Sequence, residues 1–172
     1  MESKSELHKQ LEQIRFERAL EVSESLASHR ALLTTAELAR LNNILTGKTE
    51  DPWRQEATTV TLPSGKKENL SLLTNPKLIA REKLHRATAL AESGSVIEAS
   101  VDIYVGLVLS HLFRDANRRT AVIAADYFLT RYGLHISGAA LHALAAGDLR
   151  EEEQVNELKK KIFQLAKQTS RQ

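Results

Sequence analysis

The chain has 172 residues, of which 42% are hydrophobic and 27% charged, a length and composition that suit one domain with a real core. Its 24 basic and 22 acidic side chains give a formal net charge of +2, too even to indicate nucleic acid as a partner. The absence of cysteine excludes disulfides and thiolate metal sites. Because no apolar run approaches about 18 residues and no signal peptide opens the chain, we expect a soluble, cytoplasmic protein with no membrane as a partner.

Residues 1–46 predict an N-terminal helical region. Within residues 5–28, apolar side chains recur near helical spacing among charged ones, which predicts a long amphipathic helix that packs one stripe on the core. The apolar residues of this stripe are Leu7, Leu11, Ile14, Val22 and Leu26. Thr34 and Glu37 stand at capping-box spacing and predict a second helix, which reaches Leu45 and ends at Gly47.

A β-hairpin is expected over about residues 57–71. Residues 58–62 alternate as a strand does, the turn residues Pro63-Ser64-Gly65 follow, and residues 66–70 return as a second strand. Before the hairpin, Gly47-Lys48-Thr49 is similar to the end of a phosphate-binding P-loop. That motif is excluded because Asn42 stands where it requires a glycine, and because a helix precedes it.

Two further helices are predicted before residue 111. Asn75 and Pro76 supply the cap and first residue of a helix that extends to Gly94. Ser95 and Glu98 form a second capping-box pattern. Residues 96–109 are apolar on nearly every side, which predicts a central helix in the middle of the core.

Beyond the centre of the chain, residues 120–132 predict another buried helix, ended by Gly133. Residues 134–172 predict C-terminal helices of the same domain. The first is alanine-rich, spans residues 137–146 and stops at Gly147, and the last is capped by Asp148 with Glu151. Its heptad-spaced apolar residues, which favour core packing over a dimer interface, are Val155, Leu158, Ile162 and Leu165.

Residues 111–121, HLFRDANRRTA, concentrate more potential chemistry than any other stretch. They form a short loop between two buried helices, and their last residues begin the second helix. The first turn of a helix has unpaired N–H groups and a partial positive charge, which together favour an anion. Arg119 suits two phosphate oxygens and Asn117 a phosphate, while Asp115 suits Mg²⁺. His111 titrates near neutral pH and suits a general base, and Phe113 would anchor the loop in the core.

The sequence HLFRDANRR resembles the H-x-F-x-(D/E)-(G/A)-N-(G/K)-R motif of the Fic/Doc proteins, and the following TA is like the Doc branch. A chance match to the fixed positions has a probability below about one in ten thousand for a chain of this length. Residues 51–54, DPWR, resemble the family's usual entry into its hairpin, called the flap, and Trp53 would anchor its base. The resemblance spans roughly Leu33 to Gly133.

The resemblance implies an all-α, mainly helical, single-domain Fic-type bundle with one small hairpin flap. Residues 47–133 would form its core, with the flap at about 57–71 and the motif loop at 111–119. In the family, the flap aligns a segment of a target protein by strand addition. Val60, Thr61 and Leu62 are the corresponding target-binding candidates here.

The resemblance also implies a transferase that moves a phosphate-containing group from ATP, with Mg²⁺, to a Ser, Thr or Tyr hydroxyl of a target protein. His111 would take the hydroxyl proton, and Asp115 would hold Mg²⁺. The phosphates would lie on Ala116, Asn117, Arg118 and Arg119. AMP transfer, or protein adenylylation, is our preferred activity.

Two departures from the family pattern keep other activities open. Arg118 and Val122 replace a glycine and an arginine of the AMP-transferring enzymes. A bulky cation at position 118 resembles Doc, whose branch transfers the γ-phosphoryl group as a kinase does. The same two residues would also fit a catalytically degenerate binding module.

Control by an inhibitory helix is not expected. The family's inhibitory S/T-x-x-x-E pattern aligns its serine with Ser25 and its glutamate with His29, and the arginine that the glutamate would contact is Val122. We therefore predict no glutamate-type self-inhibition. A separate antitoxin chain is a possible partner.

Overall fold

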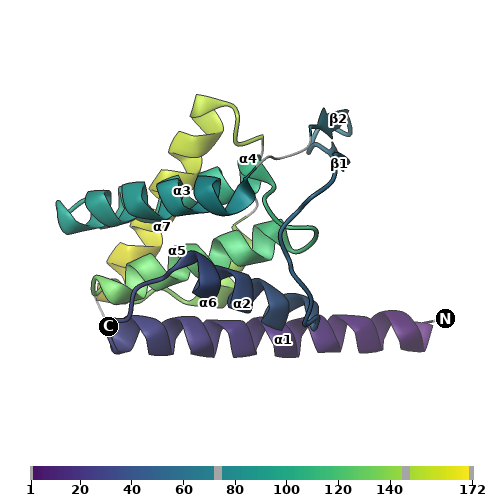
Figure 1. Cartoon of the computed structure of the whole chain (residues 1–172). Helices are drawn as coiled ribbons and strands as arrows, with labels where there is room; N and C mark the ends of the chain where they lie inside the picture. Colours follow the sequence, from purple (N-terminus) through teal and green to yellow (C-terminus); the bar gives the residue numbers. More distant parts are fainter. Residues whose placement is uncertain (1, 72–74, 145–147, 171–172) are drawn as a thin grey trace.

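The computed structural model describes residues 2–71, 75–144 and 148–170, and side chains from residue 5 to residue 167. The chain is mainly helical with one antiparallel hairpin, as the sequence predicts (Figure 1). The elements, in order, are α1 (Glu2–Ser28), α2 (Thr35–Thr46), β1 (Thr58–Thr61), β2 (Lys67–Leu70), α3 (Pro76–Glu92), α4 (Val96–Ser110), α5 (Asn117–Arg131), α6 (Gly138–Ala143) and α7 (Glu152–Ser170).

Helix α5 occupies the middle of the core, because every residue from Thr120 to Leu129 is buried. It packs against α1, α2, α4 and α6. Helix α4, predicted to run through the middle of the core, packs against α3, α5 and α7, but its end leaves Leu109 exposed and Val108 only partly buried beside an open cavity. Small residues such as Ala121, Ala124 and Ala125 let neighbouring helices approach α5 closely, and this effect outweighs the greater overall hydrophobicity of α4.

Helix α1 packs on α5 along a stripe that shares only part of the expected one, since Val22 and Leu26 pack against the core as predicted. Its buried residues are Phe16, Ala19, Ser23 and Ala27. Leu7, Leu11 and Ile14 are 58%, 40% and 60% exposed, so the prediction that they pack on the core is wrong. At 3.6 residues per turn these three side chains lie on the opposite side of the helix from the buried stripe. The small residues Ala19, Ser23 and Ala27 determine the contact face.

Several predicted helix ends are confirmed. Thr34 Oγ1 accepts a hydrogen bond from Glu37 N at 3.2 Å, and Asn75 Oδ1 accepts one from Leu78 N at 3.1 Å. Gly47 ends α2 with a left-handed φ of 72°, a conformation that glycine adopts without a steric penalty. These caps are predictable because cap and partner lie within one helical turn of each other.

Two predicted capping interactions do not form, although Ser95 does stand at the N-cap position of α4. The Ser95 side chain makes no capping hydrogen bond, and Glu98 instead pairs with Lys159 of α7 at 3.0 Å. Asp148 Oδ1 accepts from Arg150 N, and α7 begins only at Glu152. In both places the acidic side chain also pairs with a cation, Glu98 with Lys159 and Asp148 with the Arg150 guanidinium. The short helix α6 covers fewer residues than the predicted 137–146, and the predicted stop at Gly147 lies outside the described residues.

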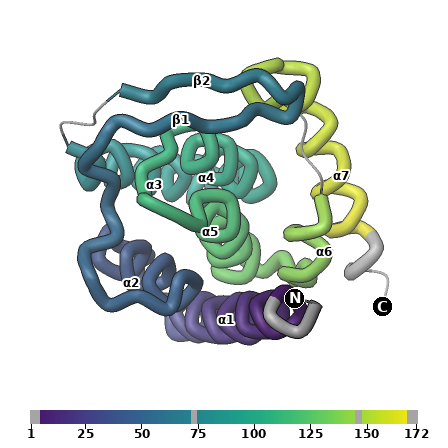
Figure 2. The backbone as a smooth tube through the Cα atoms, turned by 90° about the vertical axis from the view of Figure 1, so that its right-hand side faces the viewer, coloured from purple at the N-terminus to yellow at the C-terminus, as the bar shows by residue number. Residues whose placement is uncertain are grey.

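The hairpin lies across one end of the helices, with β1 nearer to them than β2 (Figure 2). Thr58 pairs with Leu70 and Thr61 with Lys67, close to the predicted strands. The predicted anchor is confirmed, since buried Trp53 stacks on Phe113 with 4.6 Å between ring centroids. Within the described ranges, no helix is long and apolar enough to cross a membrane.

Candidate active site

The motif loop joins α4 to α5 through two residues in the left-handed conformation. His111 ends α4 with a φ of 49°, and Ala116 precedes α5 with a φ of 57°. This conformation costs a non-glycine residue roughly 1–2 kcal/mol, so the loop needs compensating contacts. Asn117 supplies two of them, accepting from Phe113 N and donating to Phe113 O, each at 2.9 Å. The Asn117 amide, which we expected on a phosphate, is thus occupied by the backbone of the loop.

A second side chain, Asn42 of α2, also stabilises the motif loop. Its Nδ2 donates to Asp115 O and to Thr120 Oγ1, both at 2.9 Å. Asn42 is buried on the stripe formed by Leu38, Leu41 and Leu45. In the sequence, Asn42 is notable only because it stands where a P-loop would require a glycine. A polar residue on the apolar stripe of a helix was the signal that would have indicated this role.

Arg54, which follows Trp53, ties the base of the hairpin to the motif loop. Its Nε donates to His111 O at 2.7 Å, and its Nη1 donates to Glu56 O at 2.7 Å and to Ser71 O at 2.9 Å. The backbone continues the connection, since Arg54 N donates to Leu112 O at 2.8 Å. In the sequence, Arg54 is notable only as part of DPWR. It links the two segments that border His111.

The environment of His111 favours a neutral imidazole. Burial lowers its pKa first, and the positive charge of Arg54 lowers it further, while Asp115 acts in the opposite direction. A neutral imidazole has a free ring nitrogen that accepts a proton. His111 therefore meets the electrostatic requirement for a general base at neutral pH.

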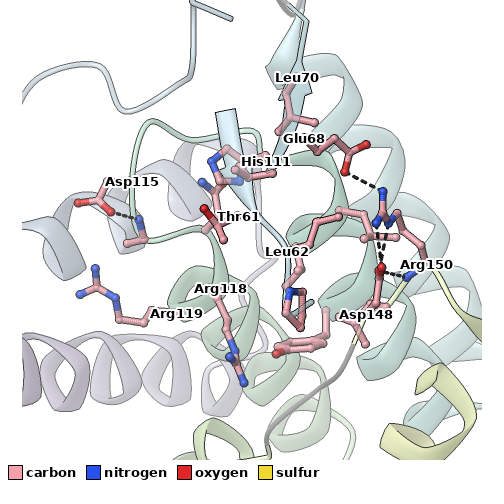
Figure 3. Close-up of a pocket in the computed structure, with 18 of the residues that line it drawn as sticks. Thr61, Leu62, Glu68, Leu70, His111, Asp115, Arg118, Arg119, Asp148 and Arg150 are labelled. Carbon is pink, nitrogen blue, oxygen red and sulfur yellow. Dashed lines mark hydrogen bonds and ion pairs between the residues drawn. The ribbon is translucent and has the colours of Figure 1, made fainter. Parts of the chain in front are cut away.

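One cavity of about 790 Å³ brings together the motif and the hairpin (Figure 3). This volume lies within the roughly 300–1,000 Å³ typical of small-molecule sites. The predicted site residues that line it are Val60, Thr61, Leu62, His111, Asp115, Ala116, Asn117, Arg118 and Arg119. Phe113, predicted as structural, is buried against Trp53 beneath the loop. Other residues that line the cavity, among them Tyr104, Glu68 and residues 148–150, were not predicted from the sequence.

The two arginines at the start of α5 extend along the cavity wall. Arg118 Nη2 donates to Leu144 O at 3.1 Å, and Arg119 Nη1 lies 4.0 Å from Glu12 Oε1. Both side chains point away from His111 in Figure 3. Their positive charges nevertheless act on His142, which also lines the cavity. Burial lowers the pKa of His142 first, and Arg118 and Arg119 lower it further. The start of α5 thus combines two guanidinium groups with the positive end of a helix.

Asp115 is the candidate metal ligand. Its carboxylate is exposed, and Oδ1 accepts from Ala116 N at 2.7 Å. In the described part of the chain, no group of three or more His, Cys, Asp or Glu side chains is arranged to hold a metal. Mg²⁺ often takes one or two carboxylates and completes its octahedron with phosphate oxygens and water. One exposed carboxylate fits Mg²⁺ bound together with a nucleotide, but not a cation held by protein alone.

The fold and the site define a helical domain in which a histidine and a cationic helix start face one cavity beneath a hairpin. Residues 32–129 match the Fic/DOC family. Since the match covers more than half of the chain, the protein belongs to that family. The solved structures that resemble it include a Fic domain containing signaling protein from Bacteroides thetaiotaomicron, with a TM-score of 0.67, 18% identity, and coverage of 91% of this chain and 69% of that one. No curated protein matches the chain.

Proposed function

We propose that this protein transfers AMP from ATP to a Ser, Thr or Tyr hydroxyl of a target protein. The observation that carries the proposal is the cavity of about 790 Å³ onto which both His111 and the start of α5 open. A base and an anion-binding helix end on one cavity are what attack of a hydroxyl on a phosphate requires. Membership of the Fic/DOC family supports a transferase.

In the proposed reaction, the hydroxyl oxygen attacks the α-phosphorus and forms a new O–P bond. The bond between the α-phosphorus and the bridging oxygen to the β-phosphate breaks, and pyrophosphate leaves. The hydroxyl proton passes to the neutral His111 imidazole. Catalysis would come from positioning and from stabilising charge on the phosphates, as in phosphate transfer generally.

The chain offers distinct groups to the ATP phosphates. Arg119 and Arg118 would turn from their contacts with Glu12 and Leu144 toward the anion, and the backbone at Ala116 and Asn117 would lie beneath it. Asp115 would hold Mg²⁺, which neutralises phosphate charge when bound. Because its amide is engaged by Phe113, we propose that Asn117 contributes mainly by holding the loop.

A second candidate, transfer of the γ-phosphoryl group, is favoured by Arg118, whose bulk restricts the approach of phosphates to the start of α5. ATP labelled at the α-phosphate or at the γ-phosphate separates the two activities. The acceptor is a peptide mixture with one Ser, Thr or Tyr between random flanks. We expect label from the α position alone, whereas label from the γ position alone would establish the second candidate and overturn the first.

The substitution His111→Ala is expected to abolish label transfer without unfolding the protein. His85→Ala, at an exposed position of α3, is the matched control and should transfer label at the wild-type rate. If the wild type transfers neither label, and ATP with Mg²⁺ leaves its melting temperature unchanged, a binding module would be the better description.

Regulation from within the chain is not part of the proposal. Ser25 and His29 are exposed, and Val122 is buried in α5. The absence of a glutamate-type inhibitory pair stays a prediction. Deleting α1 would not test it, because Phe16 and Ala19 belong to the core. Glu12→Gln tests instead whether the contact between α1 and Arg119 restrains activity, and unchanged activity is the expected result. A separate antitoxin chain remains a proposed partner.

A further inference from the structure

The hairpin is attached to the rest of the molecule at two places that differ in character. At its base, Arg54 and Trp53 form a buried connection to the motif loop. Toward its turn, Arg150 Nη1 contacts Glu68 Oε2 of β2 at 2.7 Å (Figure 3). The hairpin therefore spans the cavity between a buried and a partly exposed attachment.

Arg150 is itself held in one orientation. Its Nη2 donates to Asp148 Oδ2 at 2.8 Å, its Nε donates to Asp148 Oδ1 at 3.1 Å, and its backbone N donates to the same Oδ1 at 3.1 Å. Hydrogen bonds from Arg150 lower the pKa of Asp148, and the reciprocal contact raises the pKa of Arg150. A two-point arginine–carboxylate contact fixes the plane of the guanidinium, which leaves Nη1 directed at Glu68.

The segment that carries Arg150 is fixed to the core. Leu149, between the two paired residues, is buried in the main hydrophobic cluster. Asp148, Leu149, Arg150 and Glu68 all line the cavity that contains His111. Glu68 lies directly opposite Val60 in the hairpin register, so a contact at Glu68 also acts on β1.

We infer that Arg150 is a positioning residue that fixes the hairpin beside the cavity, so that β1 receives an acceptor segment at one height above His111. The inference rests on the proposed function, and on the expectation from the family resemblance that the acceptor segment pairs with the hairpin. A two-stranded hairpin is marginal by itself, and partly exposed ion pairs add little to global stability. Arg150 should therefore affect where the hairpin lies far more than whether the protein folds.

The first test follows the hairpin without any reaction. In Glu68→Gln and Arg150→Gln, hydrogen–deuterium exchange of residues 58–61 and 67–70 should rise several-fold, with the melting temperature unchanged. Arg150→Lys, which keeps one charged contact, should fall between. Lys67→Gln, on the exposed face of β2, is the matched control and should exchange as the wild type does.

Salt provides a test within the wild type. Raising ionic strength from about 0.1 M to about 1 M shortens the screening length from about 10 Å to about 3 Å. Hairpin exchange should rise in the wild type and in Lys67→Gln, but change little in Glu68→Gln, where the ion pair is already lost. Equal exchange in all variants and at both salt concentrations would overturn the inference.

The second test measures label transfer from ATP to the peptide mixture. For Glu68→Gln and Arg150→Gln, the apparent KM for peptide should rise several-fold with kcat nearly unchanged, and Arg150→Lys should show a smaller rise than Arg150→Gln. An unchanged KM despite faster hairpin exchange would overturn the positioning role. If the wild type transfers no label, the proposed function fails, while the exchange data still decide whether Arg150 holds the hairpin.

Discussion

Arg54 and Asp126 are both buried ionisable residues, but their surroundings are opposite. Arg54 is 4% exposed, and its guanidinium donates to the carbonyl oxygens of His111, Glu56 and Ser71. Asp126, in the middle of α5, is 0% exposed, and neither carboxylate oxygen has a hydrogen-bond partner. Hydrogen bonds to carbonyl groups compensate Arg54 for its lost hydration, whereas the Asp126 carboxyl group has no such compensation.

The difference shows how a core accommodates an ionisable group. Burial lowers the pKa of Arg54, but an arginine stays protonated in proteins, and its carbonyl partners offset the lost hydration. Burial and then the negative charge of Glu24 raise the pKa of Asp126 to about 7. Asp126 is therefore mainly a neutral acid in the folded protein below about pH 7. Arg54, the buried residue that stays charged, joins the hairpin to the loop that carries His111.

Removing Arg54 should have the largest effect. Arg54→Ala leaves the carbonyl groups of His111, Glu56 and Ser71 without their donor, and a buried group left unsatisfied costs about 1–3 kcal/mol. Because Glu56 and Ser71 are exposed and only His111 is half-buried, we expect the free energy of unfolding in urea to fall by roughly 3 kcal/mol. Arg81→Ala, at an exposed position of α3, should change it by less than about 0.5 kcal/mol. A loss below about 1 kcal/mol for Arg54→Ala would show that water replaces the guanidinium.

Asp126 should make stability depend on pH. Its folded pKa of about 7 lies above the ordinary value of 3.8, so the unfolded chain ionises first as pH rises. Stability is therefore full below pH 3.8, falls as pH rises, and levels off above about pH 7. The whole shift corresponds to roughly 4 kcal/mol.

The substitution Asp126→Asn removes this titration. Between about pH 5 and pH 8, the wild type should lose roughly 2–3 kcal/mol of unfolding free energy relative to Asp126→Asn. Glu82→Gln, at an exposed position of α3, is the matched control and should follow the wild type. Parallel pH profiles for the wild type and Asp126→Asn would show that the carboxylate is hydrated in the core.

The surroundings of Arg54 and Asp126 could not be predicted from the sequence, whereas much of the fold could. Helix ends such as Thr34 and Asn75 depend on neighbours within one turn, and the hairpin follows from alternation. The motif loop was predicted because its residues are consecutive. Arg54 meets its partner at His111 only through the tertiary fold, as Asn42 meets Asp115. For such pairs, local pattern indicates a polar residue among apolar ones but cannot name its partner.

Replacing Arg54 by lysine should produce an intermediate effect and separate charge from geometry. Arg54→Lys keeps the positive charge, but a single ammonium cannot reproduce the planar fork that reaches separate carbonyl groups. We expect a loss of about 1–2 kcal/mol in urea unfolding. Hydrogen–deuterium exchange at residues 53–56 should increase with it. A lysine variant as unstable as Arg54→Ala would mean that geometry alone makes this buried cation tolerable.

The smallest expected effect concerns Glu24, the exposed carboxylate that adds to the pKa shift of Asp126. Glu24→Gln removes a negative charge from the vicinity of Asp126 but leaves its burial intact, so the pKa of Asp126 should fall only slightly. The change should shrink at high salt, because an exposed charge is screened. An NMR titration of the Asp126 carboxyl carbon measures it. If the titration does not move even at low salt, desolvation alone raises this pKa, and the contrast with Arg54 reduces to the presence or absence of hydrogen-bond partners.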